Sequence, residues 1–303
     1  MATKFQCELS WSASRAKEFD RCKREYWYNR YASWGWWTEK PRGKKYEYMI
    51  HKNLTGLAAF TGTCMHDAIE HWFQLKAEGT VMSGKELYED AVERFRDGWR
   101  VSSDGWQAQP NKMVHLYDHH YEIPISKDRA EKMRELLERS AHYFCEHDDL
   151  IPVRAATPES WLSVESMDTY QYIGTKVYAV PDFAYSDGDK VHVWDWKTGT
   201  PRQEDHFQLR TYALYACEKW SVDPEDIILH ASYLAKGETT LISSSIEELS
   251  QTQDVMSSGI REMMDVHYDP DVDDLMMENW PPNGDEQACH WCNFRGVCEK
   301  GKE

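Results

Sequence analysis

The chain has 303 residues, with 35 Lys and Arg against 52 Asp and Glu, a formal net charge of −17, and 41% hydrophobic and 13% aromatic residues. This length supplies ample material for a buried core, and the aromatic content excludes a mainly disordered chain. No segment approaches the roughly 18 consecutive apolar residues of a membrane span, and the N-terminus lacks the apolar centre of a signal peptide. We therefore expect an intracellular protein.

The charge is distributed unevenly along the chain. Residues 15–45 contain ten Lys or Arg and four acidic residues, a local balance of +6, whereas residues 247–286 contain twelve acidic residues and one Arg. Phosphate binding is driven by Lys and Arg, so the overall acidity argues against a nucleic-acid partner while the basic stretch leaves one open. Tryptophans within this stretch either stack on single-stranded bases or fill a packed junction. They are Trp27, Trp34, Trp36 and Trp37.

The first half of the chain is predicted to be helical. Apolar residues recur at helical spacing, and Ser126 and either Ser10 or Ser12 are suitable N-caps. The first expected helix ends at about residue 31. Three more are expected at about 63–77, 85–99 and 127–147.

In the second half of the chain, apolar and polar residues alternate as they do in β-strands. The expected strands are 161–169, 176–185, 191–196, 227–234 and 238–243, with a helix at about 203–217. Ser245 and Glu248 form a capping box that opens one more helix. The predicted fold class is α/β, with helices first, a small mixed sheet crossed by one helix, and a cysteine-bearing end.

Two carboxylates and a lysine in the middle of the chain suggest a metal-dependent reaction. Asp195 and Lys197 are two residues apart on one strand, so they share a face, and the turn in SDGD brings Asp182 toward them. Converging carboxylates suit Mg²⁺ or Mn²⁺, and Lys197 is then placed to orient a water or stabilise developing charge. The alternative is a surface hairpin whose charges are merely solvated.

Three of the eight cysteines form the pattern C-x2-C-x5-C, at Cys289, Cys292 and Cys298. Thiols this close in sequence are typical of a metal or cluster site. The isolated cysteines are expected to be small buried thiols, and without a signal sequence a disulfide framework is the weaker interpretation.

The segment from Asp182 through D-W-K-T-G to Q-L-R-T-Y resembles the RecB-like branch of the PD-(D/E)XK nuclease superfamily, over roughly residues 60 to 240. The resemblance implies a restriction-endonuclease-like core that hydrolyses phosphodiester bonds with a divalent metal. One departure is Val180-Pro181, which stands where a glycine is common.

The resemblance also assigns roles to individual residues. The metal would be held by His66 in G-T-C-M-H, Asp182, Asp195 and the Trp196 carbonyl, with Lys197 catalytic. Gln208 and Tyr212, which share a helix face, would contact the DNA backbone or support the lysine. Glu165 and Glu70 are each either site carboxylates or structural residues.

Iron–sulfur nucleases of the AddB and CRISPR-associated RecB-like kind join three C-terminal cysteines to one N-terminal cysteine around a [4Fe–4S] cluster. Cys22 in F-D-R-C-K-R fits that first position, so the resemblance implies a cluster on Cys22, Cys289, Cys292 and Cys298 that staples the chain ends together. Zn²⁺ and plain buried thiols remain alternatives. Cys7 could replace Cys22, and His290 is an alternative zinc ligand.

We therefore expect three regions: an N-terminal helix and basic, Trp-rich segment (1–59), a nuclease core with a helical insertion at about 80–150 (60–245), and a C-terminal cluster segment (246–303). The resemblance implies a cytoplasmic exonuclease or end-processing enzyme of a prokaryotic cell or phage-infected host. Its substrate would be single-stranded DNA or DNA ends. The alternatives are a CRISPR-adaptation nuclease that trims spacers and a non-catalytic DNA-end-binding scaffold. No Walker motif occurs, so a helicase, recombinase or integrase partner would be another chain.

Overall fold

A computed structural model describes residues 7–38, 42–270 and 277–302. Parts of the predicted basic and acidic stretches, residues 39–41 and 271–276, lie outside this description. In the described part of the chain, no helix is both long enough and apolar enough to cross a lipid bilayer.

A five-stranded mixed sheet forms the centre of the fold, in the order β10-β9-β8-β7-β4. Strands β8 and β9 are parallel and the other neighbours are antiparallel. Helix α9 (Gln203–Trp220) makes the crossover between the parallel pair, as the sequence predicts. The strands are β4 (Trp161–Val164), β7 (Phe183–Ser186), β8 (Val191–Lys197), β9 (Ile227–Tyr233) and β10 (Glu238–Ile242).

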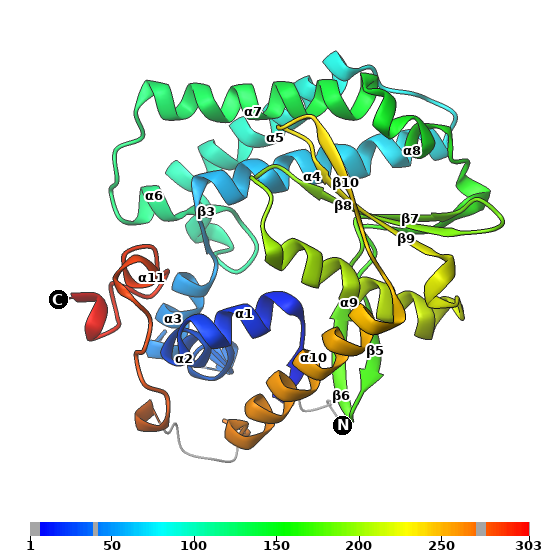
Figure 1. The fold of residues 1–303 in the computed structure, drawn as a ribbon. Coiled ribbons are helices and arrows are strands. Elements are labelled where there is room, and N and C mark those ends of the chain that lie inside the picture. Colours follow the sequence, from blue (N-terminus) through cyan, green and yellow to red (C-terminus); the bar gives the residue numbers. More distant parts are fainter. Residues whose placement is uncertain (1–6, 39–41, 271–276, 303) are drawn as a thin grey trace.

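The two faces of this sheet bury different sets of side chains because successive residues of a strand point to opposite sides. Phe183, Trp194 and Trp196 pack in one core with three long helices, whereas Val193 and Leu229 pack in another core that includes two further long helices. Figure 1 shows these two helical layers. The first layer consists of α4 (Leu57–Ala77), α5 (Gly84–Ser103) and α7 (Lys127–Glu146), and the second of α9 and α10 (Ile246–Val266).

Short strands attach the N-terminal region to this core. Strand β1 (Ser10–Trp11) pairs with β6 (Thr175–Ala179), which in turn pairs with β5 (Asp168–Tyr172). Strands β2 (Leu54–Thr55) and β3 (His115–Leu116) form a separate pair. The N-terminal helices lie beside the C-terminal segment (Figure 1). The remaining helices are α1 (Ala13–Arg21), α2 (Lys23–Trp27), α3 (Lys44–Lys52), α6 (Tyr117–His120), α8 (Ile151–Ala155) and α11 (Glu286–His290).

The first predicted helix is interrupted at Cys22, which has extended backbone angles and separates α1 from α2. The interruption frees the next two backbone N–H groups for the C-terminal segment: Lys23 donates to the Asn283 side chain at 2.8 Å and Arg24 to the Pro281 carbonyl at 3.2 Å. A five-residue π-helix then covers Tyr28–Ala32. Helical periodicity did not reveal this break because the contacts that favour it come from the other end of the chain.

Two predicted strands, 161–169 and 176–185, are each divided between two sheets. The first breaks at Glu165, whose φ of 43° lies in the left-handed region, and the second at the residues between β6 and β7. Pro181 falls in this second break, and proline cannot donate a hydrogen bond to a sheet ladder. Asp182 is therefore in the connection before β7 and not within a strand.

Helix α4 begins at Leu57, six residues before the predicted start. Gly62 looks like a helix-weakening residue in the sequence, but in the structure it serves close packing. A Cβ atom at Gly62 would lie 2.9 Å from the Thr198 hydroxyl, just beyond the end of β8. Helix α3, which begins at the end of the basic stretch, was not predicted.

Gly98 on α5 fills a similar role against α4. A Cβ atom at Gly98 would overlap the Phe60 ring, which is itself buried. We expect Gly98→Ala to lower the free energy of unfolding by about 1–3 kcal/mol, as overpacking does. The measurement is denaturant unfolding followed by circular dichroism.

The matched control is Gly259→Ala on α10, where the new methyl group would be 3.7 Å from Trp11. This is an ordinary contact, so alanine should stabilise the helix by up to about 1 kcal/mol. Equal effects of the two substitutions would contradict the close packing of α4 against α5.

Candidate active site

Asp182 lies where four segments of the chain meet. Its carboxylate accepts a hydrogen bond from the Trp196 N–H, and its backbone carbonyl accepts one from the Glu165 N–H at 3.0 Å. Phe183 pairs with Trp194 across β7 and β8, so Asp182 lies next to Asp195 in the register. The turn between these strands therefore brings the two aspartates together, as the sequence predicts.

A histidine and two carboxylates converge at this point. The His66 Nδ1 on α4 is 3.1 Å from Glu165 Oε1 and 3.5 Å from Asp182 Oδ1. One ligand atom from each residue lies within 4.8 Å of the others, which is the spacing of a shared cation site. Glu165 sits here because of its left-handed backbone, and such strained positions in non-glycine residues cluster at functional sites.

Burial and charge repulsion act together on these groups. Burial, together with repulsion from Asp182, raises the pKa of Glu165. Burial alone would lower the pKa of His66, but the Asp182 and Glu165 carboxylates raise it well above its usual range. Neighbouring carboxylates whose negative charges repel one another are stabilised when a cation joins them.

Asp195 and Lys197 form the second half of the site. The Lys197 ammonium is 2.6 Å from Asp195 Oδ2, which confirms that the two side chains share a face of β8. Asp195 is only 1% exposed, and this burial raises the pKa of its carboxyl. Burial lowers the pKa of Lys197, but Asp195 and Asp182 more than offset this and raise it, so the lysine is a cation.

The helix after β8 fixes the position of this lysine. Gln208 on α9 accepts a hydrogen bond from Lys197 Nζ at 2.9 Å and donates one to the Tyr212 hydroxyl at 2.6 Å. Burial and the nearby Asp195 raise the pKa of Tyr212 well above its usual range, so the phenol is neutral. Of the two roles that the sequence left open for this pair, the contacts in the structure match support of the lysine.

The predicted ligand set and the observed one overlap without being identical. His66 and Asp182 are in both, and Glu165 completes the observed group. The Asp195 carboxylate faces Lys197, and Trp196 reaches Asp182 through its N–H, so metal binding by Asp195 and by the Trp196 carbonyl stays a prediction. Glu70 accepts a hydrogen bond from Gln74 one turn along α4.

The donor atoms fit a divalent metal. Carboxylate oxygens with one imidazole suit Mg²⁺ or Mn²⁺, and when such an ion is bound it neutralises charge on a phosphate and lowers the pKa of a water. The residues that would hold it here are His66, Glu165 and Asp182. Around them the chain supplies Lys197 as a fixed cation and Tyr212 as a neutral hydroxyl.

The four cysteines of the predicted cluster line one cavity, although they come from opposite ends of the chain. Arg24 crosses between these ends, where its buried guanidinium donates to the Trp280 and Met277 carbonyls. The remaining C-terminal contacts include hydrogen bonds from Tyr117 to the His290 carbonyl and from Tyr121 to the Asn293 carbonyl, both at 2.7 Å.

The spacing of these thiols bears on which cofactor would fit. Four thiolates around one Zn²⁺ at about 2.3 Å lie about 3.8 Å from one another by tetrahedral geometry. Among the residues that the structure describes, three potential ligands within 4.8 Å of one another are found at His66, Glu165 and Asp182 and not among the cysteines. Thiolates are ligands both of Zn²⁺ and of iron–sulfur clusters, so the residues that line the cavity are compatible with either cofactor.

The family to which the chain belongs follows from a comparison with known families. A model of the PD-(D/E)XK nuclease superfamily matches residues 10–299, which is nearly the whole chain. The protein therefore belongs to this superfamily, whose members are metal-dependent nucleases that act on DNA. A comparison with curated proteins gives no match. The α/β fold with its mixed sheet agrees with a restriction-endonuclease-like core.

Removal of one member of the observed group should weaken metal binding. We expect His66→Ala to lower the affinity for Mn²⁺ by at least about tenfold, since loss of outer-shell partners alone often costs that much. The measurement is calorimetric titration with Mn²⁺.

The control is His71→Ala, because His71 lies on the same helix and also faces a carboxylate, Asp90, at 3.1 Å. This pair is outside the candidate site and the substitution should leave the Mn²⁺ affinity unchanged. A similar loss in both variants would show that His66 is not a ligand.

Proposed function

We propose that this protein is a Mg²⁺- or Mn²⁺-dependent deoxyribonuclease of the RecB-like branch, which removes nucleotides from single-stranded DNA or from DNA ends. The observation that carries the proposal is the meeting of His66, Glu165 and Asp182 beside the Asp195–Lys197 pair. A cation-binding group next to a half-buried, fixed ammonium has the components that phosphodiester hydrolysis requires.

Each residue has a distinct role in this proposal. His66, Glu165 and Asp182 bind the metal, with Asp195 as a further candidate ligand. Lys197, held by Asp195 and Gln208, orients the attacking water or stabilises the charge that develops on the phosphate. The hydroxyl of Tyr212 positions Gln208, so Tyr212 affects the lysine only indirectly, through Gln208.

We further propose that Cys22, Cys289, Cys292 and Cys298 bind a [4Fe–4S] cluster. The cavity that all four cysteines line supports this assignment. Burial raises the pKa of the Cys292 and Cys298 thiols, so these groups stay protonated unless a cofactor stabilises the thiolates. Such a cluster stabilises a cytoplasmic protein where reducing conditions exclude disulfides, and it would fasten the chain ends across the core.

The nuclease activity is tested by Lys197→Ala with linear and closed circular DNA in Mg²⁺ or Mn²⁺. We expect the variant to lose at least about 100-fold in rate, because a preorganised charge that stabilises a transition state contributes that much. Degradation of the linear substrate alone would support exonuclease action.

The control is Lys219→Ala, which removes an ion pair of similar length, 2.9 Å to Asp168, in the last turn of α9. It should cleave like the wild type. Absence of cleavage by the wild-type protein, or equal rates in both variants, would refute the nuclease assignment.

The cluster is tested by anaerobic purification and visible absorption. We expect a brown protein, loss of the colour in Cys22→Ser, and retention of it in Cys217→Ser, since Cys217 is on α9 and does not line the cavity. A colourless protein with stoichiometric zinc would overturn the assignment.

A further inference from the structure

A second cleft, on the side of the molecule where the N-terminal segment meets β6, is lined by cationic side chains. It has about 780 Å³ of space open to solvent. Its cations come from separate parts of the chain that the fold brings together. We call this the cation cleft, and its positively charged residues are Arg15, Arg30, Lys52 and Lys176.

Two of these four cations are neutralised by carboxylates. Arg30 pairs with Glu18 at 3.2 Å, and Lys176 pairs with Glu8 at 2.8 Å. Among the described residues, no carboxylate lies within ion-pair distance of Arg15 or of the remaining cation of the cleft, Lys52. The cation cleft therefore carries an excess of positive charge within a protein whose net charge is −17.

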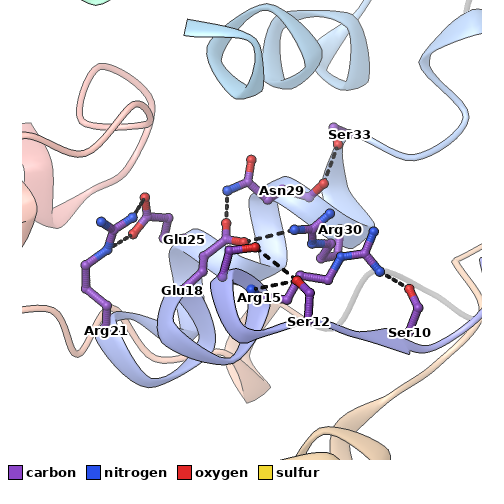
Figure 2. Close-up of polar contacts among 10 residues, drawn as sticks. Ser10, Ser12, Arg15, Glu18, Arg21, Glu25, Asn29, Arg30 and Ser33 are labelled. Atoms are coloured by element: carbon purple, nitrogen blue, oxygen red, sulfur yellow. Dashed lines mark hydrogen bonds and ion pairs between the residues drawn. The ribbon is translucent and has the colours of Figure 1, made fainter. Parts of the chain in front are cut away.

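Local contacts hold the two guanidinium groups in place. Figure 2 shows Arg15 directed toward Ser10 and Arg30 toward Glu18, with the Asn29 side chain on the same carboxylate. The Arg15 guanidinium also lies 4.7 Å from the centre of the Tyr178 ring. These groups are preorganised, so a ligand would not have to order flexible side chains.

The charges in the cation cleft repel one another. Enclosure by the protein, reinforced by the guanidinium groups of Arg30 and Arg15, lowers the pKa of Lys52 to about 8. Enclosure and Arg30 also lower the pKa of Arg15. Lys52 remains exposed to the solvent of the cleft, so an anion that entered could relieve this repulsion directly.

The cation cleft continues toward the candidate active site. A neighbouring cleft of about 910 Å³ shares Arg15, Arg30 and Tyr178 with it, and is also lined by Gln208 and Tyr212. Gln208 is the residue that holds Lys197 at 2.9 Å. An extended ligand could therefore lie along both clefts with one end beside Lys197.

We propose that the cation cleft is a phosphate-binding subsite that holds the backbone of a single DNA strand whose other part lies at Lys197. The strand would run past Gln208 and Tyr212 and place phosphates on Arg15 and Lys52. The identity of the ligand rests on the proposed nuclease function, whereas the anion-binding property rests only on the cation cleft itself.

The arrangement favours a polymer over a small anion. The cations line two adjoining clefts that together reach from Lys52 to Gln208, and an aromatic ring, Tyr178, accompanies them in both. Cations that follow a backbone, with aromatic rings for the bases, are typical of sites for single-stranded nucleic acid.

The experiment measures binding of fluorescein-labelled oligo-dT by anisotropy in EDTA, so that metal and cleavage play no part. We expect Lys52→Gln to weaken binding about fivefold at 0.1 M salt, and to make the slope of log affinity against log salt shallower by about 0.7, the loss of one phosphate contact on a single strand. Arg15→Gln should act similarly, and Lys52→Arg should retain the wild-type affinity.

The control is Lys85→Gln, because Lys85 is an exposed lysine on α5 whose loss changes the net charge equally. An equal loss of affinity in this control, or none in Lys52→Gln, overturns the proposal. So does calorimetry in which Lys52→Gln loses affinity for orthophosphate while its affinity for the strand is unchanged.

The two proposals can fail separately. Cleavage by the wild type with no effect of Lys52→Gln on strand binding would remove the subsite and leave the nuclease. Strand binding that depends on Lys52, in a protein that cleaves no DNA, would support the subsite and refute the nuclease.

Discussion

The candidate site depends on the way in which Asp182 is held. Its backbone carbonyl accepts a hydrogen bond from the Glu165 N–H. One carboxylate oxygen accepts the backbone N–H of Trp196, and the other faces His66. Three segments that are distant in sequence therefore share one aspartate, which directly precedes β7, an inner strand of the sheet. Because Pro181 and the left-handed Glu165 interrupt both strands at this level, the chain can leave the central sheet there without breaking a regular ladder.

The positively charged residues of the N-terminal region have two different roles. Some stabilise the fold, and others are available to bind a ligand. Arg24 is buried and ties the two chain ends together, and Trp27 is part of the core, where it donates to the Tyr268 hydroxyl at 2.8 Å. This tryptophan fills a packed junction, which was one of the two alternatives for the aromatic stretch. Arg15 and Lys52 are directed instead into a solvent-filled cleft. An acidic protein can in this way present a local surface for phosphate.

The sequence predicted the parts of the site that depend on local regularity. Residues two apart on a strand share a face, which placed Asp195 beside Lys197, and residues four apart on a helix placed Gln208 beside Tyr212. Glu165 could not be assigned, because its position depends on a left-handed residue within what looks like a continuous strand. The cation cleft was also missed, since its lysines and arginines are adjacent only in three dimensions.

The most direct test of the central claim is to locate the metal in a crystal of the protein grown with Mn²⁺, by anomalous diffraction. The account predicts that the strongest anomalous peak lies among the side chains of His66, Glu165 and Asp182. A strongest peak remote from all three, for example on exposed acidic residues of α10, would contradict it.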